Sequence, residues 1–449
     1  MAKLTAIVAA MLATSAAADE GLPRYRLEPG MVLTYKGSGR SQYTEMTAAT
    51  EGEMTAWVVG RSPDGSVKVV MRQGSRYASA RDGKEPELGR EPLEYEFGRF
   101  DLFPDGRLGS EGEIGHRIRP QTIFPRLPDD RGRAEAGWSS PSPDGFGTSR
   151  YEGLQAEPGG WSFRSQSEGP ENRVYESTSS KTIHFDANRG VVKRTDEEQT
   201  QGYGFQGKGT GTSELTSVEV LDSDKLAAFV RGAEAYFAAD KAVKDSYRSE
   251  DQDPAKLESA LATAKAELVK ARDAMSEGTF REALDRRIEG FDSSIRYSLD
   301  DAKRRAAVIG KPAASWKAPG LDGKAHDLAD YRGKVVVLDF WYRGCGWCVR
   351  AMPQMNEVTE HFAGKPVAVL GMNTDGDAGD AKLVVDVMGL KYDTIRIHDD
   401  RELPGKYGVQ GFPTVIVIDP EGIVRDVHVG YSKDLREKLT KSIEALLPK

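Results

Sequence analysis

Cysteine is almost absent from this chain, which holds only Cys345 and Cys348 among its 449 residues. Exported proteins often use disulfides to stabilise their folds, but this chain has no cysteine left for that purpose because both lie in one motif. The folded core must therefore come from apolar burial, and the length is ample for two or three domains. A structural zinc site needs four ligands, which one cysteine pair and singly scattered histidines do not supply.

Long apolar runs are missing as well, since no stretch reaches the roughly 18 consecutive apolar residues that cross a bilayer. The apolar segment at residues 4–13 follows Lys3 and leads to Ala16 and Ala18, which form an A-x-A-like cleavage site. We therefore expect residues 1–18 to be a signal peptide. The mature protein would be exported to the periplasm or cell envelope without spanning the membrane. An N-terminal helix of the mature fold is the alternative.

The chain also lacks an excess of positive charge. The net charge is −8, and charges of both signs are interspersed along the chain. Nucleic acids and anionic membranes attract basic surfaces, so neither is expected as a partner.

Residues 19–221 contain short alternating apolar runs separated by turn signals. Pro-Asp-Gly stands at residues 63–65 and 104–106 and Asn-Arg-Gly at residues 188–190, each between two such runs. This pattern predicts an antiparallel β domain, as a meander, a sandwich or a curved half-barrel. Residues 125–147 are rich in Pro, Gly and Ser and are expected to form an exposed loop.

No catalytic motif stands out in this β-rich region. His116 and His184 are isolated, without metal-ligand spacing around them. Trp57, Trp138 and Trp161 are expected to fill the core, and lining a ligand groove is the alternative.

Residues 222–307 change to a helical pattern, with apolar residues at steps of three and four. Asp253 followed by Pro254 is typical of a helix start. We expect a helical hairpin that acts as a spacer. Packing within one chain is favoured, and dimerisation through the hairpin is the alternative.

The cysteine pair follows the apolar run at residues 335–340 and precedes a helix-forming stretch. A strand would thus deliver Cys345 and Cys348 to the start of a helix. Unpaired backbone N–H groups and the helix dipole favour a thiolate there, which makes cysteine a good nucleophile near neutral pH. The sequence therefore predicts disulfide exchange.

From residue 310 onward the chain resembles the TlpA/ResA-like branch of thioredoxin-fold thiol–disulfide oxidoreductases. The resemblance rests on residues 310–312 (GKP), 321–324 (LDGK), 331–334 (YRGK), 339–341 (DFW), the cysteine pair, Pro353, 411–414 (GFPT) and 419–422 (DPEG). It implies an α/β thioredoxin-like domain at residues 308–449. Buried strands at residues 335–340 and 367–371, a hairpin at 414–429 and helices at 382–390 and 435–447 agree with it. The whole chain is thus expected to be an α+β multidomain protein.

The resemblance also implies roles for four residues. Cys345 would attack a substrate disulfide and Cys348 would resolve the mixed disulfide. Asp339 stands where thioredoxin carries a buried acid and could relay the proton of Cys348, although a surface residue at a strand end is the alternative. Pro413 would be cis and would hold its backbone against the cysteines, so that an extended substrate can pair as a strand. No cofactor is expected.

Two positions depart from the family pattern: Gly344 replaces the tryptophan that usually precedes the first cysteine, and the intervening dipeptide is Gly-Trp. The implied partners are protein thiols or disulfides and a membrane redox donor or acceptor, with a reductant role favoured. One alternative is a cell-envelope binding or scaffold protein with an accessory redox domain. Another is a peroxiredoxin-like peroxidase, although Asp339 and Tyr342 stand in place of its proline and threonine.

Individual residues argue against a haem-attachment motif and against a calcium loop. Haem attachment needs a histidine after the second cysteine, where Val349 stands. Residues 373–377 (NTDGD) resemble the start of a calcium loop, but Ala378 and Val384 replace the glycine and glutamate that an EF-hand needs.

Overall fold

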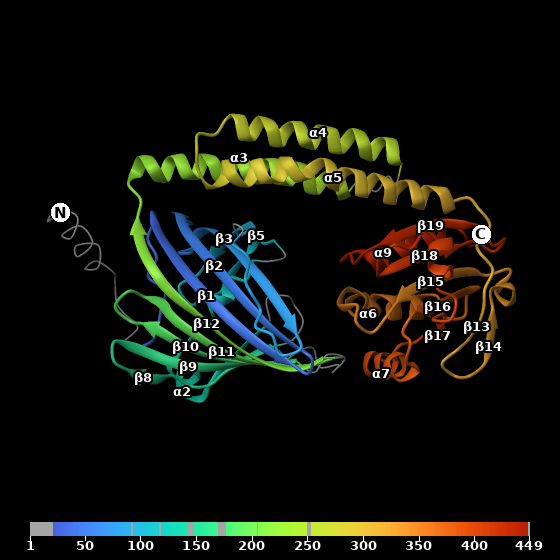
Figure 1. Ribbon diagram of the computed structural model, residues 1–449, viewed down its shortest axis with the longest axis horizontal. Helices are drawn as coiled ribbons and strands as arrows, with labels where there is room; N and C mark the ends of the chain where they lie inside the picture. The colour runs from blue at the N-terminus through green and yellow to red at the C-terminus, as the bar shows by residue number, and fades with distance from the viewer. Residues whose placement is uncertain are drawn as a thin grey trace. The chain divides into compact units, whose positions relative to one another are not determined.

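The computed structural model describes residues 21–90, 93–115, 118–141, 148–168, 177–203, 205–248 and 253–447 (Figure 1). It contains a large antiparallel sheet, a region of three helices, and a mixed sheet with helices, which confirms the predicted fold class. The expected signal peptide at residues 1–18 and His116 lie outside the described residues.

The N-terminal part is one antiparallel sheet of twelve strands. The strands are β1 (Met31–Tyr43), β2 (Met46–Arg61), β3 (Val67–Arg81), β4 (Tyr95–Leu102), β5 (Leu108–Glu113), β6 (Trp138–Pro141), β7 (Thr148–Tyr151), β8 (Gln155–Glu157), β9 (Gly160–Glu168), β10 (Ser177–Asp186), β11 (Val191–Tyr203) and β12 (Phe205–Val220). Their order is β5-β4-β3-β2-β1-β12-β11-β10-β9-β7-β6, with β8 paired to β9. The three predicted turns join β2 to β3, β4 to β5 and β10 to β11, so the prediction of an antiparallel β domain is confirmed.

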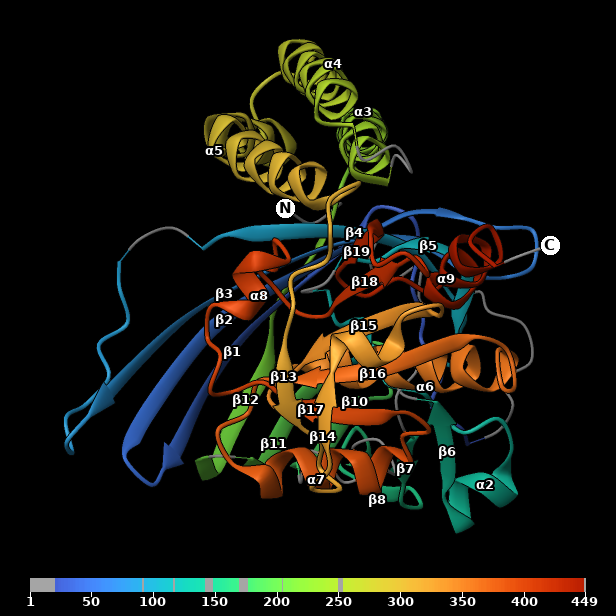
Figure 2. The same ribbon diagram turned by 90° about the vertical axis from the view of Figure 1, so that its right-hand side faces the viewer.

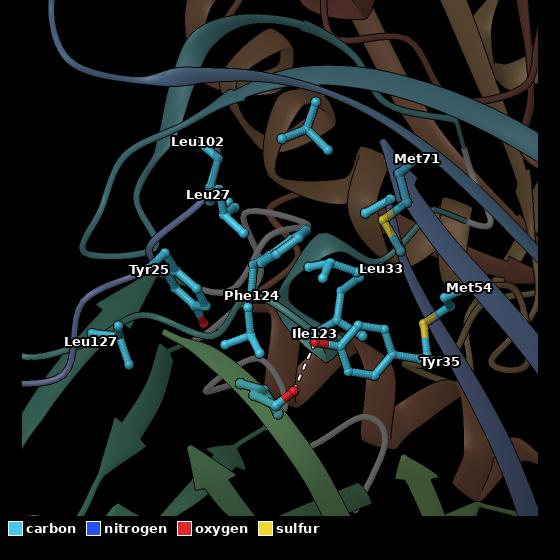
Figure 3. Packing of buried hydrophobic residues seen from close by; sticks show 14 of the residues in the cluster. Tyr25, Leu27, Leu33, Tyr35, Met54, Met71, Leu102, Ile123, Phe124 and Leu127 are labelled. Atoms are coloured by element: carbon cyan, nitrogen blue, oxygen red, sulfur yellow. Dashed lines mark hydrogen bonds between the residues drawn. The ribbon is translucent and has the colours of Figure 1, made fainter. Parts of the chain in front are cut away.

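The sheet curls around a single core (Figures 1 and 3). Strands from both ends of the sheet order contribute to this core, for example Met71 of β3 and Phe185 of β10. The segment before β1 and the one around the short helix η1 (Pro120–Thr122) fill the interior. The ring of Tyr25 lies 5.5 Å from that of Phe124 and 5.6 Å from that of Phe185, both edge-on. Side chains of these two segments therefore pack in the core on the inner face of the curved sheet.

The prediction of an exposed loop at residues 125–147 is wrong for its described part. Leu127 is fully buried, helix α2 (Arg131–Ala136) is capped by Asp130, and β6 follows. Trp138 is buried and stacks on Tyr151 at 5.0 Å. A few apolar residues anchor this segment to the core despite its turn-rich composition.

The three tryptophans of the β-rich region differ in environment. Trp138 belongs to the core and Trp161 packs against it, as expected. Trp57 instead stacks on Phe229 of helix α3 (Ser223–Arg248), at 4.8 Å between ring centroids. It therefore joins the sheet to the helix that follows it.

Removing the hydroxyl of Tyr35 should lower the free energy of unfolding by about 1–2 kcal/mol, because a buried carbonyl loses its donor. Tyr35 is fully buried and donates to the carbonyl oxygen of Val192 at 2.8 Å (Figure 3). Denaturant unfolding of Tyr35→Phe measures the loss. Tyr77→Phe is the matched control, since Tyr77 lies on the same sheet and is 59% exposed. Equal stability of the two variants would contradict the assigned role of this hydrogen bond.

The middle region contains α3, α4 (Pro254–Asp273) and α5 (Thr279–Val308). Asp253 caps α4 by accepting from the backbone of Ala255 at 2.8 Å, and Pro254 follows it, as the sequence predicted. The helices pack on one another through buried side chains such as Leu268 and Leu284, and Asp240 of α3 pairs with Arg287 of α5. These contacts lie within one chain; dimerisation stays a prediction.

The C-terminal part contains a five-stranded mixed sheet. Its strands are β15 (Val335–Trp341), β16 (Val367–Asn373), β17 (Asp393–Arg396), β18 (Thr414–Ile418) and β19 (Val424–Val429), in the order β17-β16-β15-β18-β19. The helices are η2 (Leu328–Tyr331), α6 (Gly346–His361), α7 (Ala378–Met388), α8 (Leu403–Lys406) and α9 (Leu435–Glu444), and β13 (Lys317–Pro319) pairs with β14 (Ala325–Asp327) before the sheet. Figure 2 shows β15, β16 and β17 side by side. The predicted central strands, hairpin and helices are confirmed.

The central strand β15 is buried along its whole length and separates two apolar clusters. Val335 and Val337 pack with Ala351 and Met355 of α6, whereas the even-numbered residues belong to the opposite cluster. Because side chains alternate along a strand, Asp339 faces α6. No helix within the described residues combines the length and apolarity needed to cross a membrane.

Candidate redox site

The cysteine pair lies at the start of α6, directly after the segment that leaves β15. Cys345 is the N-cap residue and forms a disulfide with Cys348, with an S–S distance of 2.05 Å. The backbone N–H of Cys348 donates to the Sγ of Cys345 at 3.0 Å. Donors of this kind, together with the helix dipole, stabilise a thiolate on Cys345 after reduction.

Both cysteines are buried in the oxidised protein, with Cys345 5% and Cys348 1% exposed. Cys348 also lies on the stripe of α6 that faces the sheet, one turn before Ala351. Cys345, at the start of the helix, is the less buried of the two.

The loop that contains Pro413 lies beside the cysteine loop, and its Phe412–Pro413 peptide bond is cis, as expected. The ring of Phe412 contacts that of Tyr342 edge-on at 5.2 Å, and the carbonyl of Tyr342 accepts from the backbone of Cys345 at 3.0 Å. On its other side, the carbonyl of Pro413 accepts from the backbone of Gly430 at 2.8 Å. The structure thus brings together the two loops that the sequence proposed as a site.

Two pairs of aromatic rings involve the cysteine segment, Tyr342 with Phe412 and Trp347 with Tyr431, and we call these four side chains the aromatic rim. Trp347 is 43% exposed, stacks on Tyr431 at 5.5 Å, and carries the guanidinium of Arg350 4.6 Å from its ring centroid. Tyr342 is 38% exposed. Sequence reasoning missed this rim, although the tryptophan between the cysteines was a visible signal.

Asp339 is 2% exposed in the middle of β15, so the alternative of a surface residue at a strand end is wrong. Its Oδ2 accepts a hydrogen bond from the hydroxyl of Tyr392 at 3.0 Å. Burial raises the pKa of Asp339 to about 7, although the Tyr392 hydrogen bond acts in the opposite direction. Burial and the neighbouring Asp339 also hold the pKa of Tyr392 well above its usual value. Asp339 lies on the side of the sheet that α6, which carries Cys348, covers. Its raised pKa allows Asp339 to exchange a proton near neutral pH.

Trp341 is fully buried at the end of β15 and serves packing, as expected. It also explains Gly371 on the neighbouring strand β16, since a Cβ there would lie 2.7 Å from the Nε1 of Trp341.

The described histidines lie apart from one another, and His184 lies 2.9 Å from Glu157 and 3.7 Å from Asp196. His326 bonds to the Tyr331 hydroxyl at 2.7 Å, and His428 lies 3.0 Å from Asp426. Within the described ranges, no group of three or more His, Cys, Asp or Glu side chains is placed to hold a metal ion. The reactive groups that the structure places at the site are the two sulfurs and the buried carboxyl of Asp339.

Comparison with known proteins points to the same part of the chain. The AhpC/TSA family matches residues 309–427. The thiol–disulfide oxidoreductase ResA of Geobacillus thermodenitrificans is 30% identical over 152 residues, which cover 34% of this chain and 86% of that protein. The thioredoxin-like protein YneN of Bacillus subtilis is 30% identical over 155 residues, 33% of this chain and 89% of YneN.

Solved structures of thiol:disulfide interchange proteins match the same part of the chain. The crystal structure of a putative thiol:disulfide interchange protein DsbE from Chlorobium tepidum is 33% identical, with a TM-score of 0.30, and the match covers 31% of this chain and 98% of that one. The relatives are matched over most of their own length but over only about a third of this chain. Through its thioredoxin-like part, which carries the Cys345–Cys348 pair, this chain belongs to the family of ResA-like thiol–disulfide oxidoreductases.

Proposed function

We propose that this protein is an exported thiol–disulfide oxidoreductase that reduces disulfides in protein substrates through Cys345 and Cys348. The observation that carries the proposal is the disulfide at the N-terminus of α6, with Cys345 as the N-cap residue. Export rests on the signal-like segment at residues 1–18. We assign the folded parts as residues 19–221, 222–307 and 308–449.

The reduced protein would act in two exchange steps. The Cys345 thiolate attacks one sulfur of a substrate disulfide, a mixed disulfide forms, and the other substrate sulfur leaves as a thiolate. Asp339, as carboxylate, then takes the proton of Cys348. The Cys348 thiolate attacks the Sγ of Cys345 and releases the second substrate thiolate. Two electrons pass to the substrate, whose sulfurs take up two protons, and the Cys345–Cys348 disulfide remains.

A second dithiol must reduce this disulfide before the next turnover, because the chain has no further cysteine. We propose a membrane redox donor for this step. The substrate would lie in extended form against the Pro413 loop and would contact the aromatic rim.

Reduction of insulin by the full chain, with a dithiol as electron source, tests the proposal. We expect turnover by the reduced protein and none by protein whose two cysteines were alkylated beforehand. An intact fold without turnover would instead favour a binding or scaffold protein. Consumption of hydrogen peroxide at rates above those for insulin would favour a peroxidase.

Replacing Trp347 by alanine should raise the KM for a protein disulfide about tenfold, because an exposed aromatic platform loses its contact with the substrate. The measurement compares kcat/KM for insulin with that for a small aromatic disulfide, which reports on the sulfurs alone. Tyr297→Ala is the control, since Tyr297 is 66% exposed on α5. Equal losses on both substrates would show that Trp347 acts on the cysteines rather than on substrate binding.

A further inference from the structure

Two buried polar residues that the catalytic steps above do not use lie at the end of β16 and in the loop that follows it. Asn373 is completely buried and Asp375 is 8% exposed. The amide of Asn373 donates to Oδ2 of Asp375 at 2.7 Å, and the backbone of Asp375 donates back to Oδ1 of Asn373 at 3.2 Å. Two reciprocal hydrogen bonds thus fix the Asp375 carboxylate in one orientation.

The same carboxylate oxygen holds the segment that carries the attacking cysteine. Oδ2 of Asp375 accepts from the backbone N–H of Arg343 at 2.9 Å, two residues before Cys345. The backbone of Thr374 donates to the carbonyl of Trp341 at 3.1 Å. Residues 341–345 are therefore attached to this loop at two points, just before the helix begins.

Charged groups around the loop keep it in place. The guanidinium of Arg396 donates to the carbonyl oxygens of Asp375 and Gly376 at 3.1 and 2.8 Å. The guanidinium of Arg343 pairs with Asp380 on α7, and His398 lies 3.3 Å from the carbonyl of Thr374. The carboxylate therefore lies in a network anchored to β17 and α7.

We propose that Asp375 is a positioning residue, which sets the reactivity of Cys345 by holding residues 341–345 in the conformation that the N-cap requires. The inference rests on the proposed function and deepens it. Gly344, directly before Cys345, gives this segment more backbone freedom than any other residue would. The hydrogen bond to Arg343 restricts that freedom from outside the loop, so that the sulfur stays close to the N–H of Cys348. The network also gives the residues 373–377 a structural role.

The test measures how quickly iodoacetamide alkylates Cys345 in the reduced full chain between pH 5 and 9, with the modified peptide identified by mass spectrometry. In Asp375→Ala the loop loses its acceptor, and the midpoint of the profile should rise by roughly one pH unit, a tenfold change in thiolate fraction at low pH. Asp375→Asn keeps an acceptor oxygen and should stay close to the natural protein. Asp377→Ala is the matched control, because this carboxylate caps α7 through Gly379 instead.

A fall in the midpoint in both Asp375 variants would show that the negative charge matters rather than the positioning. An unchanged profile in Asp375→Ala would also overturn the proposal. If Asp375→Ala does not fold, Asn373→Ser loosens the same carboxylate and should raise the midpoint in the same direction. Rapid hydrogen exchange of the Arg343 amide in the natural protein would independently contradict the hydrogen bond. Alkylation needs no substrate disulfide, so this result is independent of whether insulin is reduced.

Discussion

Replacing Cys345 by serine is expected to lower insulin reduction by at least roughly three orders of magnitude, the scale seen when an enzyme loses its nucleophile. A serine hydroxyl ionises far less readily than a thiol and cannot form a disulfide. Cys348→Ser should behave differently, because Cys345 can still attack but nothing releases the substrate. Mixed disulfides with protein substrates should then accumulate, visible on non-reducing gels and by mass.

The two serine variants control for each other, since they alter neighbouring positions and remove the same disulfide. Trapping by Cys345→Ser and not by Cys348→Ser would reverse the assigned roles. Substantial insulin reduction by both variants would exclude the pair as the site.

Replacing Asp339 by asparagine should stabilise the oxidised protein above neutral pH. In the reduced protein it should slow the resolution of the mixed disulfide by Cys348. The folded state holds the Asp339 proton up to a pKa of about 7, whereas the unfolded chain releases it near 3.8. The folded state thus binds more protons between these values, and the stability of the natural protein declines as pH rises through that window. The full difference corresponds to about 4 kcal/mol at pH 8, as an upper bound.

Denaturant unfolding at pH 4 and pH 8 measures this effect. We expect the variant and the natural protein to be alike at pH 4 and to diverge at pH 8. Asp426→Asn is a control of opposite sign. Burial works against ionisation of Asp426, but His428 and Ser442 leave the pKa of this carboxyl below its usual value. Its removal should therefore destabilise the protein at neutral pH.

The kinetic half of the same prediction separates a proton relay from a purely structural role. Asparagine cannot accept the proton of Cys348, so resolution of the mixed disulfide should slow about a hundredfold, as for a lost general base. Formation of the mixed disulfide should change much less. A variant that is less stable at pH 8, or equally fast in resolution, would contradict the assignment of Asp339.

The sequence predicted the thioredoxin-like part best, because its signals are local. The run at residues 335–340 is apolar except for Asp339, and the resemblance to thioredoxin favoured burial of that residue over a surface position. The partner of Asp339 could not be found in this way, since Tyr392 lies 53 residues further along the chain. The contact of Asp375 with Arg343 spans 32 residues and involves a backbone N–H, which no residue pattern reveals.

The sequence predicted the turns of the β-rich part. It did not predict the pairing of β1 with β12, which joins the two halves of the sheet. Turn residues act within a few positions, whereas the pairing of β1 with β12 joins Met31 to Val220. The choice between one curled sheet and a sandwich depends on that pairing. The error at residues 125–147 has a similar cause, because Trp138 finds its stacking partner, Tyr151, only in the folded chain.

The disulfide joins positions only three apart, and all remaining positions of the chain lack sulfhydryl groups. Closing so short a ring restricts the unfolded chain by about 2 kcal/mol, less than a bond between distant positions would. Repeated oxidation and reduction cannot cross-link the curled sheet, because that part of the chain holds no cysteine. Two cysteines can pair within one chain in a single way, so oxidative refolding of this protein offers no wrong intramolecular pairing.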